Sequence, residues 1–593
     1  MRKIVFILFL CVTSIVSAQS ELLAKNYFEQ GEYKKALSIF EKLSNKNPGR
    51  LDYFMLVIST NQQMENFLKA EKLLLDRLNY PIKIPQLYIE LGFNYSLQKK
   101  DSLMNKYYNV ALNYVETNPN YAYNIGKTFE KYGLLDNAVA TYERAMELSD
   151  YDFNIQLARI YGEQGRLDNM FEKYLDLILK KPIYKSTAQR NFSLYVTEDP
   201  NNEANIALMR MLLQKIQKQP NLMYNELLSW LFIQQKDYKK AFIQEKAIYK
   251  RMGDGDLTDI VDLAVLAILD EDYENATFIV NFIIENAATI EAKLEGHQYL
   301  MKIALKTATK KNYPEIIKQF ETLLDEYSRG KETYLLQLDY NYFLAFQYGD
   351  IEKAIANLKI LLKHKLTRYK ESKVKMQLAD ILVFDEKFNL ALIYYSQIQK
   401  KVKNDVLAQE ARFKVAKTSY YKGDFKWAQI QLNVLKKSTS QLIANDAMQL
   451  SLIISDNSIE DSIQSALKLY ARADLLTFQK KETEAITVLK DILTNHKGEN
   501  IEDEALFKLG ELYENKNEID KAEATYLKLI QFYNEDILAD DAHYRLAKLY
   551  ENKLELPEKA KEYYEYIIFN FADSIYFIEA RKKYRILRGD AIE

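Results

Sequence analysis

Apolar residues recur at intervals of three and four positions along most of the chain, which is the spacing of amphipathic α-helices. The first such stretch has the packing set Leu23, Ala24, Tyr27, Ala36, Phe40 and Leu43. Gly31 interrupts the stretch, and Pro48 follows it. Glycine permits a tight turn, and proline lacks the amide that would continue a helix. The pattern therefore predicts two helices joined by a turn at Gly31, the second ending near Pro48.

The same pattern returns at a fixed interval. Ala36, Ala70 and Ala138 occupy equivalent positions, and Met104 stands in the slot between the last two. The unit also has a small residue twelve positions before this slot, an aromatic residue nine positions before it and a large residue four positions after it. These residues are Gly92, Tyr95 and Tyr108 around Met104, and Gly126, Phe129 and Tyr142 around Ala138. A larger side chain at these small positions would hold the two helices of a hairpin apart.

This unit resembles the tetratricopeptide (TPR) repeat, a helix–turn–helix of about 34 residues that stacks into a solenoid. The resemblance implies an all-α fold, a right-handed superhelix of about a dozen helix hairpins. The TPR period holds over an N-terminal array at 19–182 and lapses after Pro182. Residues 183–371 are expected to form degenerate helical repeats and an irregular joint.

A C-terminal array at 372–593 has a longer period, marked by Ala391, Ala428, Ala485, Ala522 and Ala560. The step from Ala428 to Ala485 is much longer than the other three, which are nearly equal to one another. This long interval predicts one repeat plus an inserted helix, placed at 444–455.

The closing segments 509–513, 571–574, 579–581 and 587–589 resemble the end of long-helix TPR proteins of the Gram-negative envelope. The BamD-like outer-membrane assembly lipoproteins belong to that group. The likeness is confined to the C-terminal part of the array. The chain departs from that group in its lipobox, because the large Leu10 precedes Cys11.

The N-terminal residues 1–18 have the features of a secretory signal peptide. Arg2 and Lys3 precede an apolar run that ends at Val16, and small residues stand where cleavage before Gln19 would require them. The expectation is an exported, periplasmic protein, with peripheral association with the outer membrane as an open alternative. Cys11 is the only cysteine, so cleavage would leave a chain without disulfides or thiol chemistry.

Composition and motifs favour no enzyme class. The net charge of −2 gives no global nucleic-acid signal. The histidines His297, His364, His496 and His543 lack metal-ligand spacing and are expected at surfaces or helix edges. No carboxylate pair, phosphate loop or dinucleotide motif stands out. We therefore expect a non-enzymatic protein with no catalytic residues, metal, cofactor or small-molecule substrate.

Surface residues remain as candidates for function. The 45 tyrosines are expected to bury their rings and leave many hydroxyl groups in water, with some lining a binding face. By the TPR resemblance, the first helix of each hairpin lines a concave groove. The protein-binding positions mapped in this way are Tyr123, Lys127, Arg159, Phe413, Lys417, Tyr420, Phe507, Tyr544 and Lys548. Aromatic and cationic groups together suit an extended peptide or a partner helix. The alternative is that these residues pack between repeats or solvate the inner face.

Charge is distributed unevenly along the chain. Residues 359–437 hold 18 Lys and Arg against 7 Asp and Glu, a net charge of +11, and residues 499–523 hold 3 against 9, a net charge of −6. These stretches either solvate helix faces or meet charged partners. The sequence thus predicts an exported scaffold or adaptor for protein partners. The alternatives are a permanent subunit of an outer-membrane assembly, secretion or motility machine and, less favoured, a glycan- or peptidoglycan-related protein.

Overall fold

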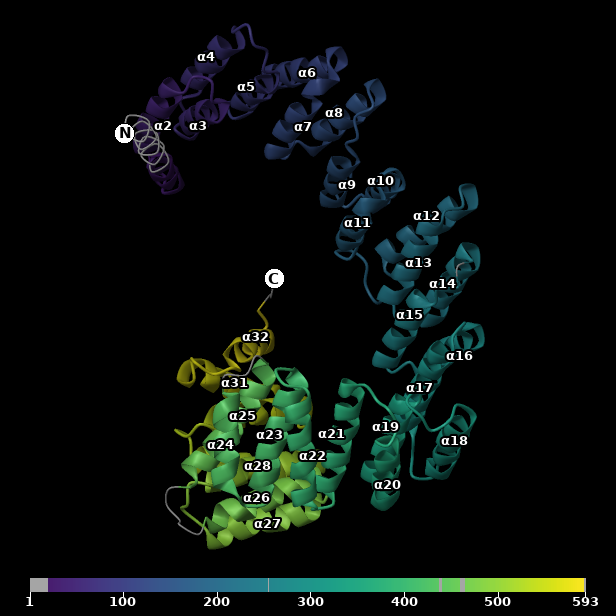
Figure 1. Cartoon of the computed structure of the whole chain (residues 1–593). Coiled ribbons are helices and arrows are strands. Elements are labelled where there is room, and N and C mark those ends of the chain that lie inside the picture. Colours follow the sequence, from purple (N-terminus) through teal and green to yellow (C-terminus); the bar gives the residue numbers. More distant parts are fainter. Residues whose placement is uncertain (1–19, 254, 437–439, 459–463, 591–593) are drawn as a thin grey trace, which may run out of the picture. The chain divides into compact units, whose positions relative to one another are not determined.

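The computed structural model describes residues 20–253, 255–436, 440–458 and 464–590. The predicted signal peptide at 1–18, with Cys11, lies outside them. The described residues form helices joined by turns, with no strand among them, and consecutive helices pack as antiparallel pairs (Figure 1). The all-α, TPR-type solenoid of helix hairpins predicted from the sequence is confirmed. The chain divides into two compact units, the first ending at Ile279 and the second beginning at Val280.

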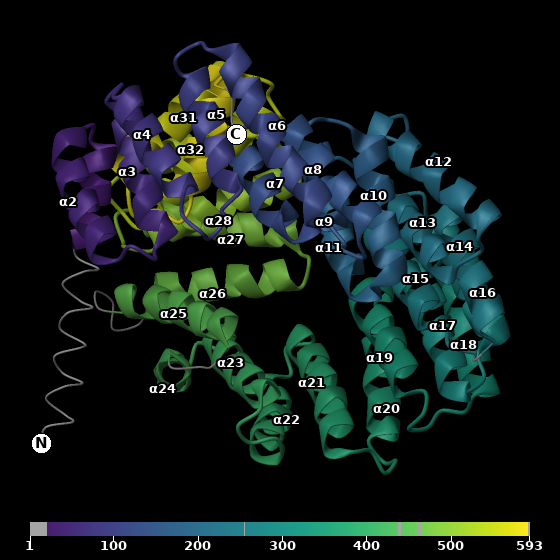
Figure 2. The same cartoon turned by 90° about the horizontal axis from the view of Figure 1, so that it is seen from above.

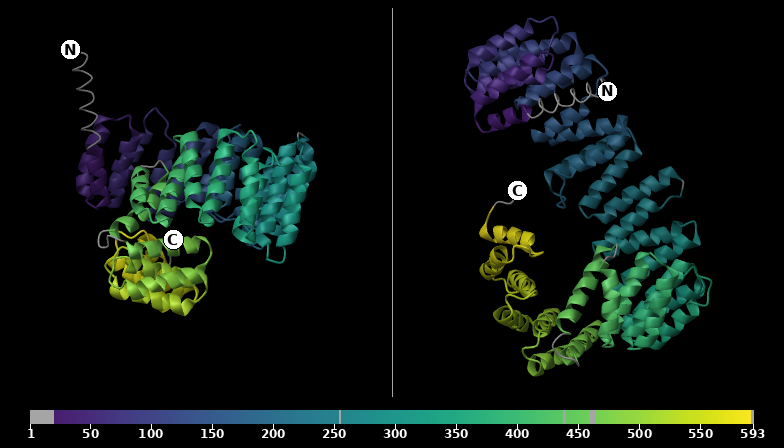
Figure 3. Two further views of the ribbon diagram at one scale, coloured as in Figure 1. Left: turned by 60° about the horizontal axis from the view of Figure 1, so that its bottom comes forward. Right: turned by 60° about the vertical axis from the view of Figure 1, so that its left-hand side comes forward.

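The first unit is a run of hairpins that follow one another in chain order (Figure 3). Residues 20–29 are helical, and Ala24 packs in one core cluster with Ala36 and Phe40 of the next helix. The named elements are α2 (Tyr33–Lys46), α3 (Leu51–Gln63), α4 (Phe67–Leu78), α5 (Gln86–Ser96), α6 (Asp101–Thr117), η1 (Pro119–Tyr121), α7 (Ala122–Lys131), α8 (Leu135–Leu148), α9 (Asn154–Glu163), α10 (Leu167–Lys180), η2 (Pro182–Tyr184), α11 (Lys185–Phe192), α12 (Glu203–Lys218), α13 (Leu222–Gln234), α14 (Tyr238–Met252) and α15 (Thr258–Leu269).

Helix α16 (Tyr273–Asn286) contains the division between the units. The second unit continues with α17 (Ile290–Thr307), α18 (Tyr313–Glu326), α19 (Tyr334–Phe343), the π-helical turn η3 (Leu344–Tyr348), α20 (Ile351–Leu361), α21 (Arg368–Phe384), α22 (Phe388–Lys401), α23 (Val406–Tyr421), α24 (Phe425–Leu435), α25 (Gln441–Asp456), α26 (Ser465–Phe478), α27 (Glu482–Asn495), α28 (Glu502–Asn515), α29 (Ile519–Phe532), α30 (Ala539–Asn552), α31 (Pro557–Asn570) and α32 (Phe577–Arg588).

Glycine and tyrosine determine how closely the helices of a hairpin approach. A Cβ atom placed on Gly126 would lie 2.3 Å from Cζ of Tyr142, which is closer than two carbon atoms can approach. The equivalent distance to the tyrosine ring is 2.5 Å at Gly92 and 2.4 Å at Gly510. In each case the tyrosine ring of the second helix lies directly against the glycine backbone of the first. The predicted requirement for small residues at these crossings is confirmed.

Several buried tyrosine rings have hydroxyl groups that donate a hydrogen bond to a carboxylate. Tyr142 donates to Glu130 at 2.8 Å, and Tyr526 donates to Glu514 at 2.5 Å. A buried hydroxyl needs a hydrogen-bond partner, and a carboxylate on the preceding helix supplies one.

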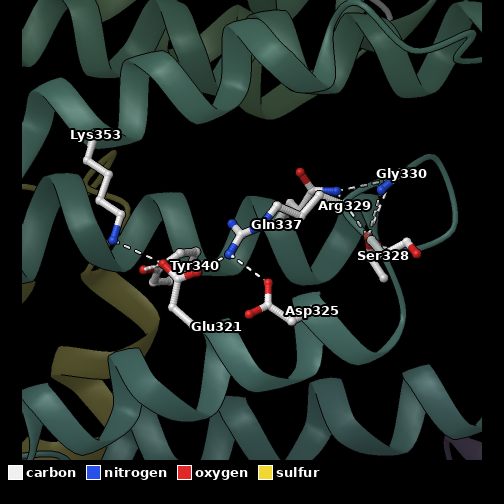
Figure 4. A network of polar contacts seen from close by, with 9 residues as sticks. Glu321, Asp325, Ser328, Arg329, Gly330, Gln337, Tyr340 and Lys353 are labelled. Carbon is white, nitrogen blue, oxygen red and sulfur yellow. Dashed lines mark hydrogen bonds and ion pairs between the residues drawn. The ribbon is translucent and has the colours of Figure 1, made fainter.

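Figure 4 shows the same arrangement between α18 and α19. The Tyr340 hydroxyl donates to Glu321 at 2.5 Å, and Lys353 approaches the same carboxylate at 3.0 Å. Arg329 also pairs with Glu321. The carboxylate that accepts the buried hydroxyl is therefore neutralised by two neighbouring cations.

An extra helix interrupts the sequence of hairpins in the second unit. The helix predicted at 444–455 is present as α25, between the α23–α24 and α26–α27 hairpins. Both α25 and α26 contact α23 (Figure 2). The end of α26 also reaches α21, because Gln479 donates to the carbonyl oxygen of Phe384 at 2.8 Å. The inserted helix thus packs against both helices of the preceding hairpin, α23 and α24.

An acidic cavity as the candidate binding site

The second unit contains a cavity of about 880 Å³. Its walls come from α23, α25, α26 and α28, and from the segments at 498–500 and 533–541. The inserted helix α25 supplies six of the lining residues: Asp446, Gln449, Leu450, Leu452, Ile453 and Asp456. The volume is in the range of ligand pockets, so the cavity is the main candidate binding site in the described residues.

Carboxylates dominate the polar part of the lining. They come from every wall except α23 and are Asp446, Asp456, Asp474, Glu499, Asp503, Glu504, Glu511, Glu535, Asp536 and Asp541. The only cations in the lining are Lys417 and Lys508. A cleft lined by one sign of charge focuses the electric field and attracts the opposite charge.

Aromatic rings form the apolar part of the lining, together with leucine and isoleucine side chains from α25. The rings are Phe413 and Tyr420 on α23, Tyr470 on α26, Phe507 on α28, and Tyr533 after α29. Such rings contribute large contact areas at a small cost in side-chain entropy.

Only some of the carboxylates have a nearby cation. Asp474 lies between Lys417 and Lys508, with both ammonium nitrogens 3.8 Å from its oxygens. Glu511 accepts a hydrogen bond from Arg545 at 3.0 Å. Four lining acids form no ion pair within 4.0 Å among the described residues: Asp446, Asp503, Glu535 and Asp536. Uncompensated negative charge therefore remains on the lining.

Burial and mutual repulsion act on these acids. The pKa of Glu504 is raised well above its usual range by burial and by the adjacent Asp503. The pKa of Asp536 is raised by burial and by the charges of Asp503 and Glu535. Each of these acids would be stabilised in its ionised form by a cation in the cavity.

Tyr420 is a buried wall residue with an unsatisfied hydroxyl group. Its side chain is 0% exposed, and the hydroxyl oxygen has no hydrogen-bond partner in the described structure. Burial raises its pKa well above the usual value, and the nearby charges of Asp474 and Glu504 act in the same direction. Tyr420 itself lines the cavity.

The cavity brings together four of the positions predicted from the sequence. Phe413, Lys417, Tyr420 and Phe507 all line it. Tyr544 and Lys548 lie on α30, outside the lining. Tyr544 is buried, with its ring stacked 4.0 Å from that of Tyr576, and the Lys548 ammonium lies 5.5 Å from the Tyr544 ring centre.

Two of the three predicted positions of the first unit, Lys127 and Arg159, pair with one carboxylate. Lys127 donates to Glu130 at 2.9 Å, and Arg159 pairs with the same oxygen. Tyr123, on the same helix as Lys127, is 49% exposed. The two cations are therefore engaged within the array, whereas the Tyr123 ring remains accessible.

The expectation for His543 is wrong. This side chain is buried, its ring stacks 4.2 Å from that of Tyr566, and its Nε2 atom lies 2.8 Å from Oδ1 of Asn534. Burial lowers its pKa to about 4. Helix packing at α30 and α31 encloses the ring, which spacing between histidines could not indicate.

Sequence reasoning missed the carboxylates of the cavity and the contribution of α25 to its wall. Two signals pointed there: the long interval between Ala428 and Ala485 and the acidic stretch beginning at Glu499. In the described part of the chain, no group of three His, Cys, Asp or Glu side chains is placed to hold a metal ion. No helix in the described part is both long and apolar enough to cross a bilayer.

Comparison with known families identifies the repeat. Tetratricopeptide repeat models match residues 22–49 and 504–533, and a second tetratricopeptide repeat model matches residues 119–152. The chain therefore contains tetratricopeptide repeats in both units. A search of curated proteins finds no match to the chain.

The solved structures that align with the chain over nearly its full length include two of low sequence identity. One is described as Naa15/Naa10 bound to HypK-THB, with 13% sequence identity, 97% of each chain covered and a TM-score of 0.32. The other is described as the APC/C hetero-tetramer Cut9-Hcn1, with 14% identity, 96% of each chain covered and a TM-score of 0.23.

Proposed function

We propose that this protein is an exported, non-enzymatic scaffold that binds a partner protein through the inner helices of its hairpins. The observation that carries this proposal is the meeting of Phe413, Lys417 and Phe507 at one cavity of the second unit. Large rings are typical of the centre of protein interfaces, where they supply contact area, and charged groups around them orient the partner. The presence of tetratricopeptide repeats supports the same role.

The proposed location is the periplasm. The basic and apolar pattern of residues 1–18 supports export, with cleavage before Gln19. Fractionation of the native cells, followed by N-terminal sequencing of the purified protein, tests this part. We expect a periplasmic protein that begins at Gln19, and a cytoplasmic protein that retains Met1 would overturn export.

The binding role is tested by crosslinking in the periplasm and capture of the full chain. Phe413→Glu and Phe507→Glu place a charge in the lining, and Tyr123→Glu makes the same kind of change at an exposed ring of the first unit. Partners bound through the cavity should be lost from the first two variants and retained by the third. Identical partners from all three variants would contradict this assignment.

A permanent place in an outer-membrane machine is the second candidate, because the C-terminal segments such as 571–574 and 579–581 resemble those of BamD-like proteins. The two functions differ in the stability of the complex. A subunit of such a machine would co-purify with a β-barrel protein through detergent, whereas the proposed scaffold would be recovered as a stable protein without it.

A further inference from the structure

We propose that the acidic cavity recognises a basic segment of the partner protein and receives an arginine side chain between α23, α25 and α28. This inference rests on the proposed function, because it names the chemistry of the segment that the scaffold would bind. The ligand proposed for the cavity is an extended peptide in which arginine alternates with apolar residues.

Charge complementarity is the first argument. The lining holds ten carboxylates and two lysines; both lysines approach Asp474, and Lys508 also approaches Glu511. Asp446 on α25 and Asp536 before α30 lie on different walls of the cavity, and neither has an ion-pair partner within 4.0 Å among the described residues. A cationic ligand in the cavity would reduce the repulsion between the lining carboxylates, whereas an acidic ligand would increase it.

The shape and mixed character of the cavity favour a peptide. The lining combines these acids with the rings of Phe413 and Phe507 and with Leu450 and Ile453 of α25. A volume of about 880 Å³ accommodates several side chains together. An alternating basic and apolar segment places a cation near the acids and its neighbours against the rings.

The unpartnered hydroxyl of Tyr420 is an independent observation. A buried hydroxyl without a hydrogen bond is unfavourable, and a tyrosine oxygen can accept one from a cationic donor. Arginine suits this position better than lysine, because its planar group has five donors and also stacks on aromatic rings. A small adjustment of the wall on binding would give the Tyr420 hydroxyl its missing partner.

Fluorescence anisotropy with the full chain tests this inference. The probe is a labelled peptide, acetyl-Gly-Arg-Leu-Arg-Phe-Arg-Leu-Gly-amide, and the matched control replaces each arginine by citrulline, which has the same shape without the charge. We expect the arginine peptide to bind at least about tenfold more tightly, with the difference falling as salt is raised. Equal affinity for the two peptides would overturn the inference.

Paired variants locate the binding site. The double variant Asp446→Asn/Asp536→Asn removes two acids from the lining, and Asp520→Asn/Asp573→Asn removes two exposed acids elsewhere in the second unit. We expect an affinity loss of about tenfold for the first and less than about twofold for the second. Equal losses would show general attraction to the acidic surface and overturn a site in the cavity.

Tyr420→Phe tests the hydroxyl without changing charge or ring. We expect it to fold normally and to bind the arginine peptide about threefold or more weakly, because the hydrogen bond to the guanidinium is lost. Unchanged affinity would overturn the proposed hydrogen bond between the guanidinium group and the Tyr420 hydroxyl.

Failure of this inference is separable from failure of the proposed function. If Asp446→Asn/Asp536→Asn retains the protein partners of the wild type, the cavity inference is wrong and the scaffold function stands. If the wild type captures no partner in the periplasm, the scaffold function itself fails. If the wild type self-associates in sedimentation and the double variant does not, the cavity binds the basic stretch 359–437 of a second copy of this chain. That result would overturn the inference that the ligand belongs to a separate partner protein.

Discussion

Two acidic sites, one in each unit, differ in whether neighbouring cations compensate their charge. In the first unit, Glu130 accepts the hydroxyl of Tyr142 at 2.8 Å and is paired with Lys127 and Arg159. In the second unit, Glu504 lies beside Asp503, and no cation among the described residues forms an ion pair with either acid. In the regular hairpins, Glu130 and Glu321 each meet two cations. The inserted helix α25 disturbs this register, and the resulting cavity retains acids that an external cation can neutralise.

The largest expected effect tests whether the two units unfold separately. Ala522 is fully buried on α29, so Ala522→Arg both overpacks the core and buries a charge. We expect a loss of several kcal/mol in the free energy of unfolding of the second unit. Hydrogen exchange should accelerate around α29 and remain unchanged around α7 and α8, since repeat arrays couple mainly to their neighbours.

The matched control is Ala524→Arg, because Ala524 is exposed on the same helix. It should leave exchange in both units nearly unchanged. Simultaneous acceleration in α7 and α29 upon Ala522→Arg would show that the two units unfold together.

Acid should destabilise the second unit through His543. Its pKa is lowered by burial to about 4, against about 6.5 in the unfolded chain, so the unfolded state binds the proton more tightly. Stability from this group is complete above pH 6.5 and falls as the pH approaches 4, by about 3 kcal/mol. The measurement is urea unfolding between pH 4 and 7.

His543→Phe keeps an aromatic ring against Tyr566 and removes the titrating group. The variant should lose this part of the pH dependence, even though it also loses the contact with Asn534. A slope identical to that of the wild type would show that other groups cause the acid sensitivity.

Neutralising one acid in each unit should have opposite effects. Glu130→Gln leaves Lys127 and Arg159 without their carboxylate, and we expect a loss of about 1–2 kcal/mol. Glu504 takes up a proton on folding, because its pKa is raised in the folded state. Its contribution to the free energy of unfolding is therefore fully present below about pH 4.5 and decreases as the pH rises. Glu504→Gln is neutral at every pH and should therefore be more stable than the wild type at pH 7, by about 1–2 kcal/mol.

Thermal and urea unfolding at pH 7 measure both variants. Glu562→Gln, an exposed change on α31, is the control and should have no effect beyond about 0.5 kcal/mol. Destabilisation by Glu504→Gln would mean that the acids of the cavity are already compensated, and the contrast between the units would disappear.

The smallest expected effect concerns two tyrosine hydroxyl groups. Tyr142→Phe removes a hydrogen bond to Glu130 and should cost about 1–1.5 kcal/mol. Tyr420→Phe removes a buried hydroxyl that has no partner in the described structure and should be neutral or stabilising by up to about 1 kcal/mol. Equal losses in urea unfolding would indicate that a water molecule already satisfies the Tyr420 hydroxyl.

Much of the architecture could be predicted from local patterns. The spacing of apolar residues determines which helix faces are buried, and glycine twelve positions before the alanine determines the close crossing with tyrosine, as at Gly126 and Tyr142. The long interval between Ala428 and Ala485 also indicated the inserted helix that is present as α25. These features depend on neighbours within one hairpin or the next, so a repeating sequence records them directly.

Tertiary structure alone decided where charges and hydroxyl groups meet. The sequence proposed Phe413, Lys417, Tyr420 and Phe507 as separate groove positions, and packing around α25 placed all four at one cavity. Whether an acid is compensated depends on side chains from several elements that are distant in the sequence. Periodicity determines which face of a helix is buried, whereas the angle and spacing between packed helices determine whether Glu130 meets Arg159 of the next hairpin and whether Glu504 is buried without a cation.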